Sequence, residues 1–287
     1  MKGNDKLKTG LVLEGGAMRG IYTAGVLDVF LDKNIKFDVV VGVSAGAIHG
    51  CTYLAAQNGR NIRYYKKYCR DRRFMSLYSL ITTGSLVGEQ FCYHDIPDRL
   101  APFDYETFRN CGSDFYAVCT DVEKGTPVYV KIDNMKTQIN YLLASASMPM
   151  VSKTVELGGR KLLDGGVSDS IPFKAAQKLG CDRIVVVQTR EEGYRKSPEG
   201  NFVSELMYKK YPDFAKAIRN RHKQYNSTLD YISRAEKNGE IVVIRPTRHV
   251  DIKRTEKNPE IIEKMYQLGR ADAEEKAESV MHYLNVK

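Results

Sequence analysis

The sequence lacks the features that mark several classes of protein. Its 287 residues contain no run of 18 apolar residues, so the sequence predicts no membrane-spanning helix. Residues 1–10 are mostly polar and hold no apolar stretch, so we expect no secretory signal there. The six cysteines form no Cys-x-x-Cys pair, which argues against a zinc site and predicts reduced thiols in a cytoplasmic protein.

Acidic residues are in the minority, and the formal net charge is +9. A basic balance favours anionic partners, either phospholipid headgroups or nucleic acid, but no nucleic-acid-binding motif is present and we expect none to be bound. Residues 60–73 carry seven Lys/Arg against one acid, and the nearly uncharged residues 74–87 follow. A basic helix beside an apolar segment predicts peripheral contact with an anionic membrane, at the inner face for a cytoplasmic protein. The alternative is a solvated helix face that leads into a buried segment.

Short apolar strands alternate with helices along the chain. Such alternation predicts an α/β fold with a mostly parallel central sheet and helices on both faces. Without repeats or linkers, we expect a single domain over 1–287, with a core at about 8–190, a helical insertion at about 60–110 and an extension at about 191–287. Strands are expected within 11–16, 37–44, 114–132, 154–166, 182–190 and 240–246, and helices within 21–34, 45–59, 136–148, 172–180, 201–237 (broken near Pro212) and 258–284.

A Gly-x-Ser-x-Gly pentad, from Gly42 to Gly46, lies between an expected strand and an expected helix of small residues. This spacing is typical of a sharp turn that holds a nucleophilic serine above a sheet. Ser44 is the candidate nucleophile, and the helix that follows it would favour developing negative charge. The alternative is an ordinary N-cap serine.

A serine nucleophile needs a base, and histidine is a weak candidate here. His49 lies five residues after Ser44, about 500° around and about 7 Å along a helix, so it points away from the pentad. The other four histidines lie in segments without catalytic markings. Asp164, in Leu-Leu-Asp-Gly-Gly, is a better candidate because burial beside two leucines can raise its pKa toward neutrality. The alternative is a turn-forming aspartate.

A third motif, Glu-Gly-Gly-Ala-Met-Arg-Gly, covers residues 14–20. Glycines between a strand and a helix expose backbone N–H groups that can bind an anion or an oxyanion. The motif does not fit the dinucleotide fingerprint, because Ala17 replaces the middle glycine and no acidic residue ends the next strand.

These three motifs, in this order, resemble the patatin-like phospholipase family of lipid acyl hydrolases. The resemblance covers about residues 10–190 and implies a three-layer patatin-like architecture, without a metal or cofactor. It also implies a Ser44–Asp164 dyad and an oxyanion hole from the backbone of Gly15, Gly16 and Ala17. The remaining motif positions that match are Arg19, which braces the loop, and Gly20, Gly42, Gly46, Gly165 and Gly166.

Two positions depart from the family pattern. Ala17 stands where many relatives have glycine, and Ser170 stands where asparagine is common. The resemblance implies a serine hydrolase of the phospholipase or lysophospholipase type, with a lipid acyl ester as substrate and an acyl-enzyme intermediate. The alternatives are a Ser-His-Asp esterase with a remote histidine and a catalytically silent module that binds membrane lipid. The oligomeric state has no signal in the sequence.

Overall fold

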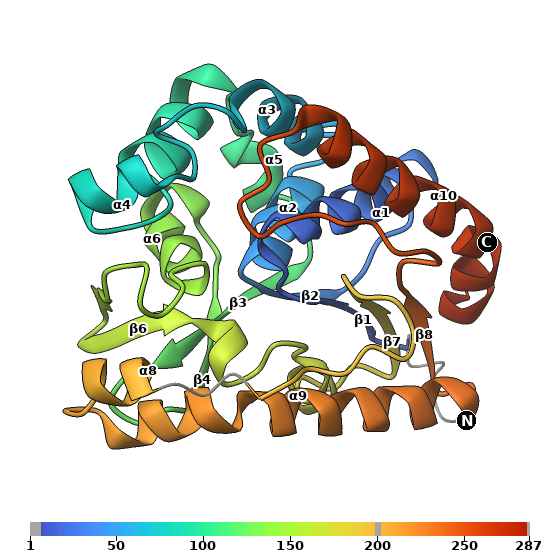
Figure 1. The fold of residues 1–287 in the computed structure, drawn as a ribbon. Helices are drawn as coiled ribbons and strands as arrows, with labels where there is room; N and C mark the ends of the chain where they lie inside the picture. The colour runs from blue at the N-terminus through green and yellow to red at the C-terminus, as the bar shows by residue number, and fades with distance from the viewer. Residues whose placement is uncertain (1–6, 199–201, 286–287) are drawn as a thin grey trace.

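The computed structural model describes residues 7–198 and 202–285. An eight-stranded sheet crosses the described chain in the order β5-β6-β3-β2-β1-β7-β8, and β4 pairs with β3 (Figure 1). Across the sheet from β3 through β2, β1 and β7 to β8, neighbouring strands are parallel. Strands β4, β5 and β6 form antiparallel pairs. The expected mostly parallel sheet is therefore confirmed. The strands are β1 (Thr9–Leu13), β2 (Val39–Val43), β3 (Asp114–Asp121), β4 (Pro127–Lys131), β5 (Val155–Leu157), β6 (Arg160–Asp164), β7 (Arg183–Val187) and β8 (Ile241–Ile244).

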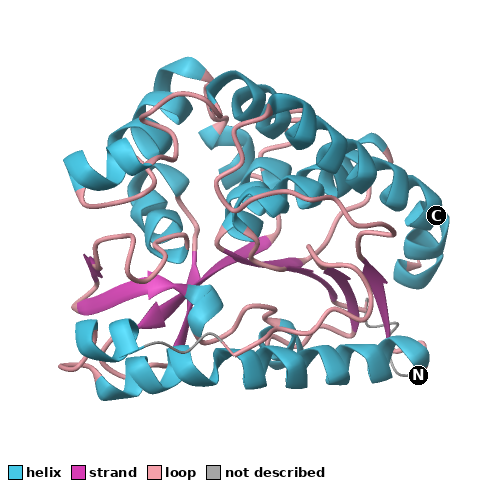
Figure 2. Cartoon of the chain, viewed as in Figure 1, coloured by secondary structure: helices cyan, strands magenta, loops and turns pink. Residues whose placement is uncertain are grey.

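Helices cover both faces of this sheet, which gives the expected three layers (Figure 2). The alternation of β1 shows the division: Leu11 and Leu13 pack in the cluster with α1, α2 and α10, whereas Val12 packs with α7 and α9. The helices are α1 (Ile21–Asp32), α2 (Ala45–Leu54), α3 (Arg60–Tyr68), α4 (Leu77–Thr83), α5 (Tyr105–Arg109), α6 (Met135–Ser145), α7 (Phe173–Lys178), α8 (Phe202–Met207), α9 (Pro212–Lys237) and α10 (Pro259–Leu284), with a π-helical turn at Phe91–Leu100.

The C-terminal segment is built into the same layers. Strand β8 extends the sheet beside β7, and α10 lies along α1 (Figure 1). Two buried tyrosine–carboxylate hydrogen bonds join these helices: the Tyr22 hydroxyl donates to Asp272 at 2.9 Å, and the Tyr266 hydroxyl donates to Asp28 at 2.7 Å. The single-domain organisation stays a prediction.

Several element ends differ from the expected ones. The helix expected over 45–59 ends at Leu54, because Ala56 and Gly59 adopt positive φ angles of 53° and 67° and turn the chain into α3. Strand β1 ends at Leu13 rather than at residue 16. The break near Pro212 is confirmed, since α8 and α9 lie on either side of it. Residues 1–6, part of the stretch in which we expect no secretory signal, lie outside the described residues. Residue 201, at the start of the helix expected over 201–237, lies outside them too.

One edge of β3 determines where the site forms. Residues 114–118 of β3 pair with β2, and residues 119–121 pair with β6, while β4 occupies the opposite edge. Strands β2 and β6 therefore meet end to end, because Val43 lies opposite Val118 and Asp164 lies opposite Cys119. This arrangement brings Ser44 and Asp164 together although 120 residues separate them.

The described residues show two further features. All six cysteines fall among them and are free thiols. Within residues 7–198 and 202–285, no helix combines the length and the apolar character needed to cross a membrane.

Candidate active site

Ser44 sits on a strained turn between β2 and α2. Its backbone has φ 54° and ψ −122°, a conformation that costs a non-glycine residue about 1–3 kcal/mol. The flanking glycines make the turn possible: a Cβ on Gly42 would lie 2.6 Å from Cα of Ala47, and one on Gly46 would lie 2.6 Å from the carbonyl oxygen of Leu13. The pentad therefore needs both glycines for close backbone approach.

The rest of the Ser44 backbone is anchored. Its N–H donates to Oγ of Ser145 at 2.9 Å, and that hydroxyl donates to the carbonyl oxygen of Val118 at 2.6 Å. Its carbonyl oxygen accepts the first α2 hydrogen bond, from Ile48 N at 3.1 Å. The side chain of Ser44 makes no cap, so its hydroxyl stands at the positive end of α2 without serving that helix.

Asp164 ends β6 and faces Ser44. Both residues line the same cavity, and the Ser44 hydroxyl favours the charged form of the carboxyl group; Gly166 N donates to its Oδ1 at 2.7 Å. Its backbone is held by Ser147, whose carbonyl accepts from Asp164 N at 2.8 Å, and by the Thr120 hydroxyl, which donates to the Asp164 carbonyl at 2.8 Å. Burial raises the pKa of Asp164 above its usual value, against the opposing effect of the Arg221 charge and these hydrogen bonds. The direction suits a base that works near neutral pH.

The glycine-rich loop runs beside this pair. The N–H of Gly15 donates to the Ser170 carbonyl at 3.3 Å, and the Ser170 hydroxyl donates to the Gly166 carbonyl at 2.7 Å. Ser170 thus ties the loop to the Asp-Gly-Gly turn, which is formed by Asp164, Gly165 and Gly166. Within the described chain, the N–H groups of Gly16 and Ala17 donate no hydrogen bond. Ala17 has a φ angle of 48°, in the left-handed region that glycine adopts at the lowest cost. This backbone conformation agrees with the glycine that many relatives have at this position.

Charged groups lie beneath the loop. Glu14 is buried, and its carboxylate accepts from Thr189 N at 2.6 Å and from the Tyr225 hydroxyl of α9 at 2.5 Å. Arg19 lies in the short 3₁₀ turn Ala17–Gly20, and its Nε is buried without a hydrogen-bond partner among the described residues. Burial lowers the pKa of Arg19, and the charge of Glu14 opposes that shift.

Two cavities meet at Ser44. The first, about 100 Å³, is mainly apolar and follows one face of α2 from Ala45 through Ile48 to Thr52, between α6 and the insertion at 60–110. The second, about 430 Å³, is more polar and holds Asp164, Gly16 and several cations. Ala17, Ser44 and Met148 line both. The hydroxyl of Ser44 therefore stands where a narrow apolar channel opens into a wider polar one.

No histidine reaches this place. All five histidines are described, and none lines either cavity. His49 is fully buried, its ring centroid lies 5.5 Å from that of Tyr65, and burial lowers its pKa to about 3. It is therefore a neutral packing residue of α2.

Two protein-family models match the chain. The model described as patatin-like phospholipase matches residues 11–176, more than half of the 287 residues. The chain belongs to the patatin-like phospholipase family. A second model, described as a domain of unknown function (DUF6363), matches residues 211–285, a region in which the sequence alone shows no family resemblance.

Relatives of this patatin-like chain include uncharacterised and named proteins. It is 30% identical to the uncharacterised protein YjjU of Escherichia coli over 62% of this chain and 51% of that protein. It is 27% identical to lysophospholipase NTE1 of Saccharomyces cerevisiae over 62% of this chain and 10% of that one. The chain thus spans about half the length of the first relative and a tenth of the second. The crystal structure of VipD from Legionella pneumophila aligns with a TM-score of 0.46 and 13% identity, over 96% of this chain and 67% of that chain.

The sequence motifs of the patatin-like family do not include three basic residues that the structure places at the second cavity. Lys196, Arg221 and Arg254 line it, and each follows the last residue of the patatin match. Arg221 Nε donates to the Gly166 carbonyl, beside Asp164. No sequence signal marks these residues, because each belongs to a different segment and only tertiary packing brings them together.

Proposed function

We propose that this protein is a serine hydrolase that cleaves acyl esters of lipids through a Ser44–Asp164 dyad. The observation that carries the proposal is the position of Ser44 and the buried carboxylate of Asp164 in one polar cavity, at its junction with an apolar cavity. Membership of the patatin-like phospholipase family supports it, as do relatives that are named lysophospholipases.

In the first step, Oγ of Ser44 attacks the ester carbonyl carbon while its proton moves to the Asp164 carboxylate. The N–H groups of Gly16 and Ala17 stabilise the oxyanion, and one such donor contributes about 3–4 kcal/mol in comparable sites. Collapse of the tetrahedral intermediate breaks the ester C–O bond, and the leaving alcohol takes the proton from Asp164. The acyl group remains on Ser44.

In the second step, a water molecule attacks the acyl-enzyme. Asp164 accepts a proton from this water, and the same two N–H groups stabilise the second oxyanion. The fatty acid leaves as Oγ of Ser44 regains the proton. Asp164 thereby acts as base and acid in turn, and no histidine takes part.

The apolar cavity is the natural place for the acyl chain. It begins at Ser44 and extends about 12 Å along α2 to Thr52, given a rise of about 1.5 Å per residue. Beside its far end, the guanidinium of Arg60 donates to the Ala101 carbonyl at 2.6 Å and to the Thr52 hydroxyl at 3.4 Å. The insertion at 60–110 thus supplies much of the wall of the proposed acyl channel.

The test of the dyad is hydrolysis of p-nitrophenyl butyrate and of a lysophospholipid by the wild type, Ser44→Ala and Asp164→Asn. We expect both variants to lose at least 10³-fold in kcat/KM, and a fluorophosphonate probe to label Ser44 in the wild type. His49→Gln should retain activity, because His49 touches neither cavity. Full activity in either dyad variant would overturn the proposal, and an essential histidine would favour the Ser-His-Asp alternative.

We also propose that the protein binds an anionic membrane through two exposed apolar helices. On α4, Leu77 and Ile81 are 71% and 84% exposed, and on α8, Leu206 and Met207 are 58% and 54% exposed. The two helices lie at the same end of the molecule (Figure 1). Exposed apolar residues in such numbers at one end are typical of an interaction surface.

The loop at 148–153 connects these helices with the site. Leu86 N, just after α4, donates to the Val151 carbonyl at 2.7 Å, and Met150 N donates to the Tyr208 hydroxyl, just after α8, at 3.1 Å. Met148 and Met150 also line the second cavity. These contacts support the apolar end as the side from which lipid would reach Ser44.

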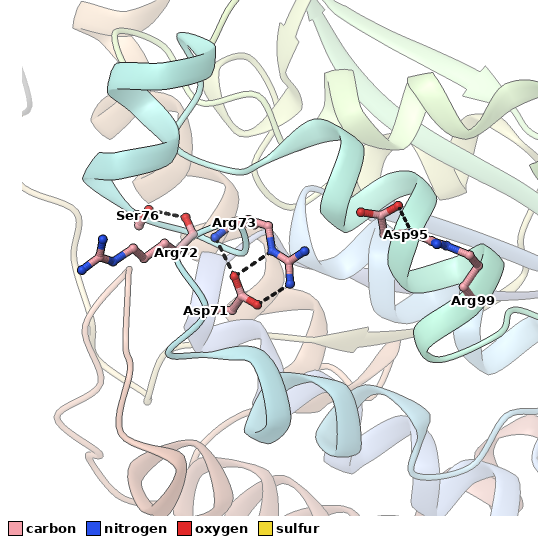
Figure 3. Close-up of polar contacts among 6 residues, drawn as sticks. All are labelled: Asp71, Arg72, Arg73, Ser76, Asp95 and Arg99. Carbon is pink, nitrogen blue, oxygen red and sulfur yellow. Dashed lines mark hydrogen bonds and ion pairs between the residues drawn. The ribbon is translucent and has the colours of Figure 1, made fainter.

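Cations around this end favour an anionic lipid surface as its partner. Lys209 and Lys210 follow α8, and Lys153 lies beside Gly84 at the end of α4. Before α4, Arg73 forms a two-pronged pair with Asp71, whereas the side chain of Arg72 points away from that pair (Figure 3). Exposed cations next to apolar residues attract anionic headgroups before insertion.

A further inference from the structure

The apolar cavity is a narrow channel with two helical walls. On α2, Ala45, Ile48 and Thr52 line it, and their spacing places them on one face of the helix. A volume of about 100 Å³ along a wall of about 12 Å leaves room for one extended alkyl chain, which would start at Ser44. A similar stripe on α6 and its C-terminal end forms the second wall: Met135, Ile139, Leu142 and Ala146.

Arg60 closes the far end of this channel, beside Thr52. It is the first residue of α3, it lines the channel, and only 7% of its surface is exposed. Its Nε and Nη2 donate to the Ala101 carbonyl at 3.0 and 2.6 Å, and its Nη1 donates to the Thr52 hydroxyl at 3.4 Å. Its Cζ lies 5.2 Å and 5.4 Å from the ring centroids of Tyr64 and Phe103. These contacts hold the guanidinium across the end of the channel.

A buried guanidinium is a barrier to an alkyl chain. The carbonyl, the hydroxyl and the rings around Arg60 replace the water that the charge loses on burial, which a methyl group cannot do. To pass, a longer chain would have to break the two hydrogen bonds to Ala101 and leave a charged group unsatisfied. The closure of the channel therefore depends on one side chain.

A second pocket lies on the other side of Arg60. It has a volume of about 350 Å³ and is lined by Gln57, Lys67 and Ala101, together with Arg60 and Tyr64, which also line the channel. Arg60 and Tyr64 thus separate the channel from this outer pocket. If the Arg60 side chain were cut back to its Cβ, a chain too long for the channel would have space to continue.

The length of the channel sets a limit on the acyl chain. An extended chain of single bonds advances about 1.2 Å per bond, so about 12 Å of channel holds about ten bonds. We propose that Arg60 makes the protein select medium-length acyl esters, of about ten carbons, over long ones. The proposal rests on the lipid acyl hydrolase function proposed above. It gives the insertion at 60–110 a direct part in substrate choice.

The kinetic test compares the p-nitrophenyl esters butyrate, octanoate, decanoate and palmitate in micelles of a neutral detergent. In the wild type, kcat/KM should rise by up to about fourfold per methylene as far as decanoate, because each methylene is buried in the channel, and should fall for palmitate. Arg60→Ala should raise palmitate relative to decanoate about tenfold. Arg60→Lys keeps a charged donor beside Ala101 and should keep the wild-type order. Each ester is compared between variants, so its partition into micelles cancels.

Two further variants keep the test independent of the folding of Arg60→Ala, and thermal unfolding verifies that each variant is folded. Ile48→Phe narrows the channel one turn of α2 from Ser44 and should lower decanoate relative to butyrate about tenfold. Arg70→Ala removes an exposed guanidinium that donates to the Lys257 carbonyl and lines neither pocket, so it should leave the order unchanged. Equal changes at every length in Arg60→Ala, or an unchanged ratio in Ile48→Phe, would overturn the proposal.

A binding test separates the length limit from the reaction. Hexanoate, octanoate, decanoate and myristate are titrated into Ser44→Ala, with and without Arg60→Ala, and followed by calorimetry. In Ser44→Ala the affinity should rise as far as decanoate and then level off, whereas in the double variant it should continue to rise. If Ser44 resists the fluorophosphonate probe while this pattern holds, the hydrolase proposal fails and the length limit stands. If the probe labels Ser44 but the affinity of Ser44→Ala rises without a break to myristate, the hydrolase proposal stands and the length limit is wrong.

Discussion

At the scale of single residues, opposing influences act on Asp164. Burial disfavours its charged form, while Arg221, Arg254 and the hydrogen bonds from Ser44 and Gly166 favour it. Burial prevails, so the pKa is raised. A base must be ionised to accept the Ser44 proton, so kcat/KM should be lost as the pH falls through this raised pKa. The acid limb of the pH profile thus reports the environment of one carboxyl group.

Arg221→Gln tests whether the pKa of Asp164 sets the acid limb of the pH profile. Removing a cation that favours the carboxylate should raise the pKa of Asp164, so the acid limb of kcat/KM should move to higher pH. Arg221→Lys keeps the charge and should keep the limb near its wild-type position. The profile is measured with p-nitrophenyl butyrate, an uncharged substrate that carries no phosphate. If the rate falls but the acid limb does not move, the predicted effect of Arg221 on the pKa of Asp164 is wrong. Arg221 would then act only by binding the Gly166 carbonyl.

At the scale of elements, the sequence predicted single strands and helices better than it predicted which strands lie side by side. The β-branched run before Ser44 and the glycines of the pentad predicted a strand, a turn and a helix, which β2 and α2 confirm. The meeting of β2 and β6 on one edge of β3 left no local mark, because strand register depends on partners far along the chain. The resemblance to a family supplied the Ser44–Asp164 pairing that patterning could not.

Helix α9 is the clearest case of information beyond the motifs. Its periodicity predicted a helix but gave no sign that Tyr225 would donate to Glu14, or that Gln224 would donate to the Ser168 carbonyl. Through these contacts α9 holds both the glycine-rich loop and the Asp-Gly-Gly turn. Helix α9, which resembles no catalytic motif, thereby supports both the proposed oxyanion hole and the proposed base.

Tyr225→Phe should expose this support. The Glu14 carboxylate would lose one of two hydrogen bonds, at a cost of about 1–3 kcal/mol in unfolding free energy. Burial raises the pKa of Glu14 in the folded state and Tyr225 lowers it, so the variant should raise it further. A raised carboxyl pKa stabilises the fold below the unfolded value and loses that contribution as the pH rises through the folded one. The loss should therefore be larger at pH 8 than at pH 5.

Thermal unfolding at the two pH values measures this effect, and kcat/KM shows whether the glycine-rich loop moves. Tyr231→Phe is the matched control, because its hydroxyl lies on the same helix and accepts only from the Gln177 side chain, at 3.3 Å, among the described residues. An equal loss for the two variants, or a larger loss at pH 5, would contradict the role of Glu14.

At the scale of the whole molecule, the two cavities and the apolar end form one route. The end with α4 and α8 meets the loop at 148–153, that loop lines the polar cavity, and the polar cavity joins the apolar channel at Ser44. A lipid leaving a bilayer would move along this route with its acyl chain entering beside α2 and its headgroup remaining in the polar cavity. Membrane binding and catalysis would then depend on different residues.

Vesicle flotation separates these two dependences. Ile81→Ser and Leu206→Ser each remove an exposed apolar side chain worth about 1–2 kcal/mol of membrane binding, so each should lower partitioning about five- to thirtyfold. Binding should be stronger to vesicles that contain phosphatidylglycerol than to pure phosphatidylcholine, and should weaken as salt rises.

Leu100→Ser, which changes an exposed leucine on neither helix, is the control, and thermal unfolding verifies that each variant is folded. Unchanged flotation of both helix variants would remove α4 and α8 from the membrane contact. The basic face of α3, where Arg63 and Lys67 are exposed, would then be the surface to vary, because it carries the charge that the sequence places before the apolar segment.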